Sequence, residues 1–206
     1  MYGHPAHLMA PDDALAALAA FDRAAILVVV GADGLDAAQV PFMLHGDRLV
    51  GHLARANPLW RAAPCAALVI CPGPEAYVSP SWYETKARTG KAVPTWNYEV
   101  LHVHGRLTAF EDLDRLRTLV DDLSNAHEAG RPSPWRMADA PADYIETMLR
   151  GFVGIEVAID RIEGKRKLSQ DKPNDDKAGV RAALSASDDP RDRAVAAAMD
   201  AIDQKA

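Results

Sequence analysis

The distribution of apolar positions predicts a chain that contains many β-strands. "AAILVVVG" at 24–31 is a short continuous apolar run. "VGIEVAI" at 153–159 alternates apolar residues on one face, as a half-buried strand does. Four further apolar runs lie between these two, each bounded by turn-forming residues. We therefore expect strands over 24–31, 37–44, 49–54, 65–73, 93–107 and 153–159.

Two dipeptides predict β-hairpins in the first quarter of the chain. Asp33-Gly34 and Gly46-Asp47 each separate two apolar runs. Glycine adopts the positive φ that tight hairpin turns require, so each dipeptide favours two antiparallel strands.

Helical spacing of apolar residues predicts helices between and after the strands. The clearest lies at 111–128, where Leu113, Leu116, Val120 and Leu123 form one apolar stripe. A short helix is also expected within "RANPLWRAAP" at 55–64. Two more are expected, at 12–20 with Asp12 or Asp13 as its N-cap, and within 139–151 with Asp139 as N-cap and Gly151 as stop.

The composition changes after about residue 171. The segment becomes rich in Asp and Ala, and "SASDDP" separates two short helical patterns. Val195, Met199 and Ile202 can together present one apolar face for docking. We expect a main domain at 1–170 and a C-terminal helical appendage at 171–206. The order of elements favours an α+β fold with a mainly antiparallel sheet or barrel.

Composition and charge indicate a soluble globular protein. The 206 residues suit one medium domain, and 49% are hydrophobic and 25% charged. No apolar run approaches the roughly 18 residues needed to cross a bilayer, and no signal-peptide pattern opens the chain, so we expect a cytoplasmic protein. The net charge of −6 disfavours nonspecific DNA binding without excluding a local basic patch.

Several common chemistries lack their motifs. Cys65 and Cys71 lie six apart on one predicted strand, roughly 20 Å from each other, too far for a disulfide. No CxxC, GxSxG, GxGxxG or GxxxxGK[ST] pattern is present. A thiolate zinc site, a hydrolase triad and a Rossmann or P-loop nucleotide site are therefore unsupported.

The stretch "VPTWNYEVLHVHG" at 93–105 carries the most unusual strand face. Alternation places Trp96, Tyr98, His102 and His104 together, while the opposite face ends in a Leu-x-Val-x-x-x-Leu pattern typical of a core. Two histidines alone do not complete a metal shell, so we expect no metal site. A solvated or interfacial sheet face and a wall for a planar ligand both remain open.

Two basic turns are candidate phosphate contacts. In "GHLARANPLW", His52 and Arg55 flank a turn, and a guanidinium offers several donors to a phosphate. In "GKRKLSQ", Lys165 and Lys167 precede Ser169 and Gln170. A solvated turn would show the same residues, so both interpretations stay open for each.

Seven blocks of sequence carry a family resemblance. They are "MYGHPAH", "GHLARANPLW", "YVSPSWYETK", "VPTWNYEVLHVHG", "PWRMADAP", "MLRGFVGIEV" and "IEGKRKLSQ". In this order they closely resemble the PaiB-like family of FMN-binding negative transcriptional regulators, from about residue 1 to about residue 184. One departure follows "KLSQ", where the family usually has Asn-Arg or Asn-Lys and Pro, whereas this chain has "DKPNDD". It adds a carboxylate, Asp171, beside the expected phosphate contact.

The resemblance implies an FMN-binding split barrel, a Greek-key antiparallel fold that forms a homodimer with the flavin at its interface. It places the phosphate near Arg55 or the Lys165–Lys167 turn and the flavin ring near Trp96 and His102. The candidate cofactor-binding residues are His52, Arg55, Asn57, Trp96, Asn97, His102, Lys165, Lys167, Ser169 and Gln170.

Two other functions remain open on this fold. One is a flavin-dependent oxidoreductase, in which the flavin carries the chemistry and few catalytic side chains are needed. The other is haem binding, with His102 or His104 as axial ligand. Direct contact with DNA is doubtful, because no helix-turn-helix or basic recognition helix is evident in this acidic chain.

Overall fold

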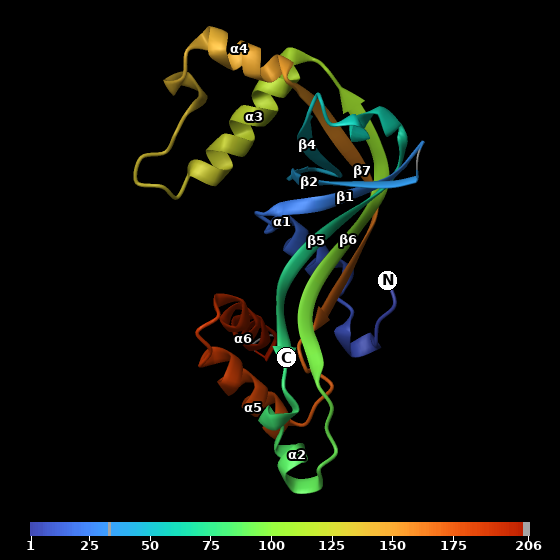
Figure 1. Ribbon diagram of the computed structural model, residues 1–206, viewed down its shortest axis with the longest axis vertical. Helices are drawn as coiled ribbons and strands as arrows, with labels where there is room; N and C mark the ends of the chain where they lie inside the picture. Colours follow the sequence, from blue (N-terminus) through green and yellow to red (C-terminus); the bar gives the residue numbers. More distant parts are fainter. Residues whose placement is uncertain (33, 204–206) are drawn as a thin grey trace. The chain divides into compact units, whose positions relative to one another are not determined.

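The computed structural model describes residues 1–32 and 34–203 (Figure 1). The strands of this part form one sheet in the order β2-β1-β5-β6-β7-β4-β3. Pairs β1–β2, β1–β5, β3–β4 and β4–β7 are antiparallel, which confirms the predicted class. The strands are β1 Ala24–Gly31, β2 Gly34–Pro41, β3 Met43–His45, β4 Arg48–Ala54, β5 Cys65–Val78, β6 Thr95–Phe110 and β7 Phe152–Lys167.

Helices and short 3₁₀ turns connect these strands. The α-helices are α1 Pro11–Ala19, α2 Glu84–Thr89, α3 Leu113–Glu128, α4 Ala142–Arg150, α5 Asn174–Ser185 and α6 Pro190–Asp203. The 3₁₀ turns are η1 Pro5–His7, η2 Pro58–Ala62, η3 Pro80–Trp82 and η4 Met137–Asp139. Each helix in the described residues is too short or too polar to cross a bilayer.

The chain divides into two compact units. Unit 1 comprises residues 1–14, 72–101 and 163–206, and unit 2 comprises residues 15–71 and 102–162. The long strands β5, β6 and β7 contribute residues to both. Residues 163–170 therefore group with the helical C-terminal segment, whereas the expected boundary between residues 170 and 171 stays a prediction.

Both predicted hairpins are present in unit 2. β1 pairs with β2 up to Gly31 and Gly34, and Gly34 has a φ of 112°. Asp33, the first residue of that predicted turn, lies outside the described residues. The β3–β4 hairpin turns at Gly46, with a φ of 59°. The strand predicted at 37–44 is divided, because β2 ends at Pro41 and β3 starts at Met43.

The two predicted aspartate caps are wrong. Helix α1 starts at Pro11, since proline suits the first helical turn, and Asp12 and Asp13 therefore lie inside that turn. Helix α4 has Pro141 as its N-cap, while Asp139 accepts a hydrogen bond of 2.8 Å from the backbone N–H of Arg136, the N-cap residue of η4. The expected stop of α4 at Gly151 is confirmed.

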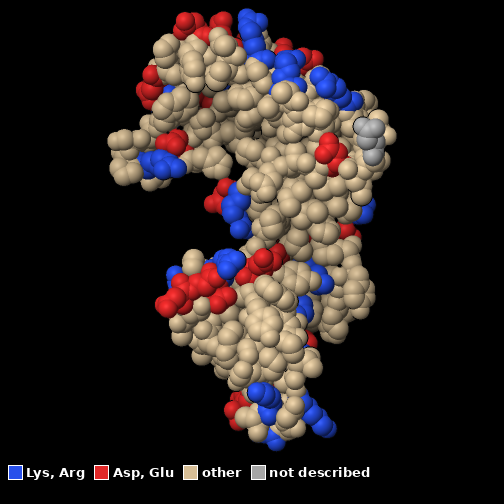
Figure 2. Space-filling model, viewed as in Figure 1, with Lys and Arg blue, Asp and Glu red and all other residues tan. Residues whose placement is uncertain are grey.

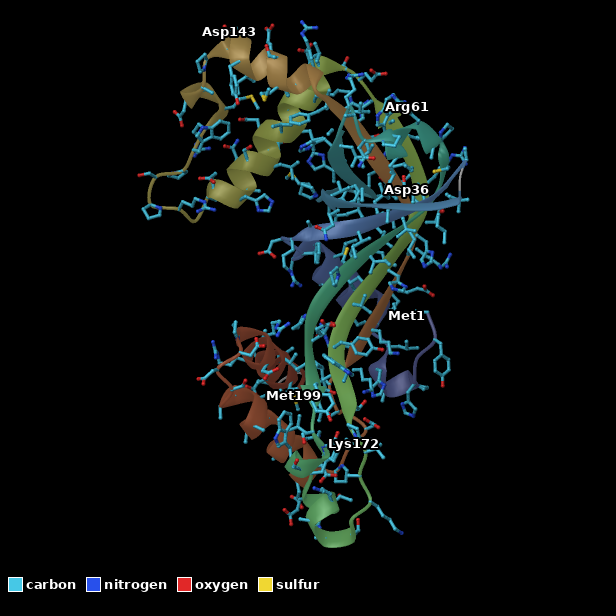
Figure 3. All side chains as sticks on the ribbon, viewed as in Figure 1. Met1, Asp36, Arg61, Asp143, Lys172 and Met199 are labelled. Atoms are coloured by element: carbon cyan, nitrogen blue, oxygen red, sulfur yellow. The ribbon has the colours of Figure 1, made fainter. Side chains whose placement is uncertain are left out.

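Each unit has its own apolar cluster. In unit 2, α3 and α4 pack through Leu116, Ile145 and Leu149. In unit 1, α5 and α6 pack against the end of β5, and this cluster includes the buried Val195 and Met199 with the partly buried Ile202 (Figures 1 and 3). The predicted docking face of the C-terminal helices is thereby confirmed.

Candidate functional site

Strand β6 presents two different faces, as alternation predicted. Leu101, Val103 and Leu107 are buried, whereas Trp96 is 52% exposed. Asn97 lies on the buried face and is only 1% exposed. A polar amide at such a position needs hydrogen-bond partners, because a buried amide without them is costly.

Ser169 supplies those partners from the turn that follows β7. The Asn97 amide nitrogen donates to Ser169 Oγ at 3.0 Å, and Ser169 Oγ lies 3.2 Å from Asn97 Oδ1. Ser169 is buried and has a φ of 65°, a conformation that residues other than glycine rarely adopt. Such backbone strain persists where surrounding structure holds it, and it clusters at ligand sites.

Asn97 and Ser169 border a cavity of about 450 Å³ that lies entirely within unit 1. Lys167 also lines it, and its ammonium donates to Thr95 Oγ1 at 2.6 Å and to the Trp96 carbonyl at 2.5 Å. Both acceptors are uncharged. In the described part of the chain no carboxylate lies within ion-pair distance of Lys167. Burial lowers the pKa of Lys167, although the charge of Asp171 acts in the opposite direction from beyond ion-pair distance.

The carboxylates at this cavity already have partners. Asp171 contacts Lys172 Nζ at 3.0 Å and His7 Nε2 at 3.4 Å. Burial would raise the pKa of Asp171, but the hydrogen bond and charge of Lys172 outweigh it and hold the pKa below its usual value. Asp176 accepts from the Thr85 backbone N–H at 2.8 Å. The added carboxylate noted in the sequence is therefore ion-paired, and Figure 3 labels Lys172 in this turn.

Tyr83 closes another part of the cavity wall. Its side chain is 5% exposed, and its hydroxyl makes no hydrogen bond of normal geometry with a described residue. Burial raises the pKa of Tyr83, so the hydroxyl stays protonated and is a donor at neutral pH. Sequence reasoning missed Tyr83, although it lies in the block "YVSPSWYETK", and it also missed Thr95 and Lys172.

Three other candidates in unit 1 lie beside this cavity rather than in its wall. Gln170 braces the turn, because it accepts from Leu168 N at 2.7 Å and donates to Arg166 O at 2.6 Å. Lys165 Nζ donates to Tyr2 O at 3.2 Å. Trp96 forms an exposed aromatic pair with Tyr77, with ring centroids 6.0 Å apart in an edge-to-face arrangement.

The Arg55 turn belongs to unit 2, and each guanidinium nitrogen of Arg55 makes one contact within the chain. Arg55 Nε donates to the Arg150 carbonyl at 2.8 Å, Nη2 donates to the Phe152 carbonyl at 3.1 Å, and Nη1 pairs with Glu111. Asn57 Oδ1 accepts from Leu59 N at 3.0 Å and caps η2. These contacts fix the turn to the segment between α4 and β7. A phosphate role for Arg55 or Asn57 stays a prediction.

His52 lies on β4 with its ring against Phe152, with centroids 4.6 Å apart. Its Nδ1 is buried and has no hydrogen-bond partner among the described residues. Burial lowers the pKa of His52, so the imidazole is neutral at physiological pH. Its role toward a cofactor stays a prediction.

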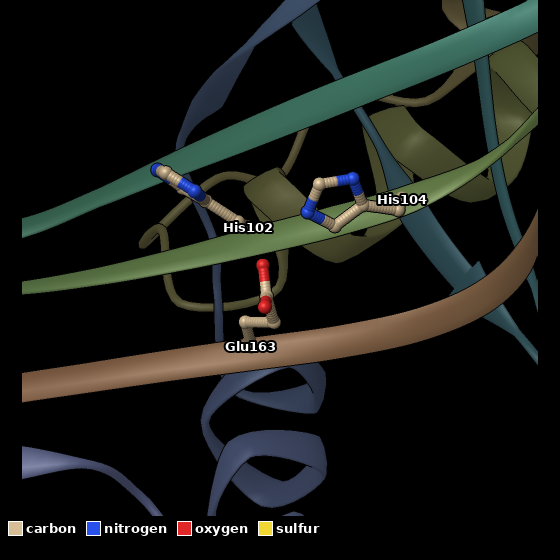
Figure 4. A group of neighbouring side chains, drawn as sticks. All are labelled: His102, His104 and Glu163. Atoms are coloured by element: carbon tan, nitrogen blue, oxygen red, sulfur yellow. The ribbon is translucent and has the colours of Figure 1, made fainter. Parts of the chain in front are cut away.

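His102 and His104 project from the same face of β6, with ring centroids 6.4 Å apart (Figure 4). Among the described residues of unit 2, no third His, Cys, Asp or Glu side chain completes a three-ligand group with them. Glu163, also drawn in Figure 4, belongs to unit 1, where it pairs with the Met1 ammonium at 2.6 Å. Unit 2 alone therefore offers two imidazole ligands at this face.

Both cysteines are free thiols, as expected. Burial raises the pKa of Cys71 to about 12. Burial also raises the pKa of Cys65. Neither is a thiolate at neutral pH, so neither is an activated nucleophile.

Solved structures with the same fold identify its class. The chain superposes on an FAD- and haem-binding protein of Mycobacterium smegmatis with a TM-score of 0.59 and 20% identity, covering 84% of this chain and 79% of that one. A flavocytochrome of Azotobacter vinelandii gives a TM-score of 0.52 and 14% identity, covering 77% and 68%. The fold is the split barrel, which confirms the predicted fold class.

The family follows from the sequence comparison. Residues 1–161 match the model of the family described as "Putative FMN-binding domain", so the chain belongs to that family. This membership confirms the resemblance to FMN-binding proteins and makes FMN the cofactor of the domain.

Individual relatives cover different shares of the chain. An uncharacterized protein of Emericella nidulans is 32% identical over 184 residues, which is 71% of this chain and 73% of that protein. The Bacillus subtilis protein named protease synthase and sporulation protein PAI 2 is 30% identical over 154 residues, 74% and 72% of the two chains. An uncharacterized protein of Aspergillus fumigatus is 35% identical over 150 residues, 65% of this chain and 58% of that one. The chain thus spans less than two thirds of this last relative.

Proposed function

We propose that this protein binds FMN with the phosphate at Lys167 in the cavity of unit 1. The observation that carries the proposal is the half-buried Lys167 ammonium, which is held by two neutral oxygens and has no carboxylate partner in the described residues. A phosphate dianion would be an anion in direct contact with this ammonium and would accept a charge-assisted hydrogen bond. Lys172, on the same cavity wall, adds a second cation.

The size and lining of the cavity support a small organic ligand. About 450 Å³ lies within the range of small-molecule sites, roughly 300–1,000 Å³. Val93, Pro94 and Tyr83 add apolar surface to the polar wall of Asn97 and Ser169. Bound FMN supplies hydride or electron transfer, and the residues of this chain hold and orient it.

Comparison of two flavins tests the proposal, because riboflavin is FMN without the phosphate. Purified protein is titrated with each, and quenching of flavin fluorescence gives the two dissociation constants. We expect FMN to bind at least about tenfold more tightly, a difference of about 1.4 kcal/mol. Absence of FMN binding, or equal affinities for the two flavins, contradicts the proposal.

We further propose that the protein is a homodimer. The supporting observation is the aromatic pair of Tyr77 and Trp96, which are 46% and 52% exposed on unit 1. Exposed aromatic residues are enriched where proteins associate. Size-exclusion chromatography with light scattering measures the mass: a dimer is expected, and Trp96→Glu should reduce it to a monomer. A wild-type monomer at micromolar concentration overturns this part.

The biological role that we propose is negative regulation of transcription, as in the PaiB-like family. The name of the Bacillus subtilis relative, protease synthase and sporulation protein, supports a regulatory role. Lys and Arg side chains are interspersed with Asp and Glu on the face shown in Figure 2, so indirect action is favoured over direct contact with DNA. Two assays distinguish a regulator from an oxidoreductase. Mobility-shift assays on promoter fragments at physiological salt test for DNA binding, and NADH and NADPH oxidation assays test for redox activity.

A further inference from the structure

The hydroxyl of Tyr83 is the least satisfied polar group at the cavity of unit 1. Tyr83 is only 5% exposed, and its Oη makes no hydrogen bond of normal geometry with a described residue. An unpaired buried hydroxyl is costly, so such groups in folded proteins require an explanation. A hydrogen bond to a bound ligand would satisfy the Tyr83 hydroxyl.

The backbone fixes where this hydroxyl lies. Tyr83 ends η3, where its N–H donates to Pro80 O at 3.1 Å, and it starts α2, where its carbonyl accepts from Lys86 N at 3.1 Å. The ring packs in the same apolar cluster as Val78, Leu168 and Val180. A side chain held at both its backbone and its ring has little freedom to turn away, so its donor is preorganised.

The groups that act on the hydroxyl carry charges of both signs. Lys172, Asp171 and Asp176 all act on Tyr83 electrostatically. Both carboxylates already have partners within the chain, as described above. The nearby Ser169 hydroxyl exchanges hydrogen bonds with Asn97, and it also acts on Tyr83 as a hydrogen-bond donor that lowers the pKa of Tyr83. A donor at the Tyr83 oxygen leaves the Tyr83 O–H itself without an acceptor among the described residues. An acceptor that enters the cavity therefore meets one uncommitted neutral donor beside the Lys167 and Lys172 cations.

We propose that Tyr83 Oη donates a hydrogen bond to the phosphate monoester bound at Lys167, and that Tyr83 thereby determines the preference of this cavity for phosphorylated ligands. This inference rests on the proposed function, because it assigns a second residue to the same phosphate. Tyr83 is a binding residue in this role and takes no part in proton transfer.

Tyr83→Phe separates ligand binding from structure, since it removes only the hydroxyl. A purely structural tyrosine would destabilise the free protein when its hydroxyl is lost. An unsatisfied hydroxyl that serves a ligand gives the opposite pattern: the melting temperature of the free protein is unchanged or rises by about 1–3 °C, while the affinity for FMN falls about tenfold. Affinity for riboflavin should not change.

The matched control is Tyr144→Phe, which removes an exposed hydroxyl on α4 in unit 2. It should change neither the melting temperature nor either flavin affinity. Inorganic phosphate is the third probe, and it should raise the melting temperature of the wild-type protein more than that of Tyr83→Phe.

The outcomes distinguish this inference from the proposed function. If the wild type binds phosphate but not FMN, the FMN proposal fails, and the phosphate comparison alone decides the role of Tyr83. The Tyr83 inference is overturned if the variant binds FMN as the wild type does, loses riboflavin affinity equally, or melts several degrees lower without ligand. If the wild type binds neither phosphate nor FMN, both proposals fall.

Discussion

Lys167 in unit 1 is the last residue of β7, and Arg55 in unit 2 directly follows β4. The two cations differ in the partners that the chain provides. Arg55 donates to two backbone carbonyls and pairs with Glu111. Lys167 donates only to one hydroxyl and one carbonyl, and burial lowers its pKa. The first has a carboxylate in direct contact, whereas the second experiences the charge of Asp171 only from beyond ion-pair distance.

This difference indicates how to separate a structural cation from a ligand-binding one. A guanidinium that already donates to backbone carbonyls and to a carboxylate is fixed in orientation by them and has fewer donors left for a phosphate. An ammonium with neutral acceptors gains a charged partner without losing one. We therefore propose that the Lys167 turn binds phosphate and that the Arg55 turn stabilises the fold.

The largest expected effect is on FMN affinity when the Lys167 charge is removed. Lys167→Met keeps most of the apolar stem and should weaken FMN binding about 100-fold, equivalent to about 2.7 kcal/mol. Lys86→Met makes the same change at an exposed lysine on α2 of the same unit and should leave the affinity within about twofold. Isothermal titration calorimetry measures both. Equal losses in the two variants would show a general charge effect rather than a phosphate site.

The second prediction concerns the Arg55 turn and the free energy of unfolding. Arg55→Lys keeps the charge but cannot donate to Arg150, Phe152 and Glu111 in the same fork geometry. We expect a loss of about 2 kcal/mol of stability in chemical denaturation, since hydrogen bonds from charged donors contribute about 1.5–3 kcal/mol. The affinity of the folded variant for FMN should change far less than in Lys167→Met. A large affinity loss with unchanged stability would reverse our assignment of the two turns.

The sequence predicted the sheet well because burial depends on alternation, which is visible along the chain. Leu101, Val103 and Leu107 were expected on the core face of the 93–107 strand, and they are buried. Helix caps were less predictable. Asp139 has the right side chain for a cap, but Pro141 starts the helix, and the Asp139 carboxylate is used by Arg136.

The candidate site was predictable only in part. Lys167, Ser169 and Asn97 came from the family resemblance, and the structure brings all three to one cavity. The partners of Arg55 and the surroundings of Tyr83 Oη depend on contacts between segments far apart in sequence. Arg55 reaches carbonyls almost 100 residues away, at Arg150 and Phe152. No local pattern around residue 55 or residue 83 encodes such contacts.

The smallest expected effect is a pH dependence that follows from the lowered pKa of Lys167. FMN binding needs the charged ammonium, so the affinity should be constant at pH values below the pKa of Lys167 and fall as the pH rises through it. Because this pKa is lowered, the fall should begin at a lower pH than for an ordinary lysine with a pKa of 10.5. The slope cannot exceed about tenfold per pH unit for one proton. At pH values between the lowered pKa of the folded protein and 10.5, Lys167 binds more protons in the unfolded chain than in the folded one. This group therefore makes the free protein more stable as the pH rises through that range.

Lys167→Arg tests this origin, because a guanidinium stays charged across the whole range. FMN affinity measured from about pH 7 to pH 10 should decline in the wild type and stay flat in Lys167→Arg, whatever the absolute affinity of the variant. An identical decline in both proteins would assign the titration to another group. A decline confined to the wild type, together with a rise in stability of the free protein over the same pH range, would show that the Lys167 ammonium binds the phosphate.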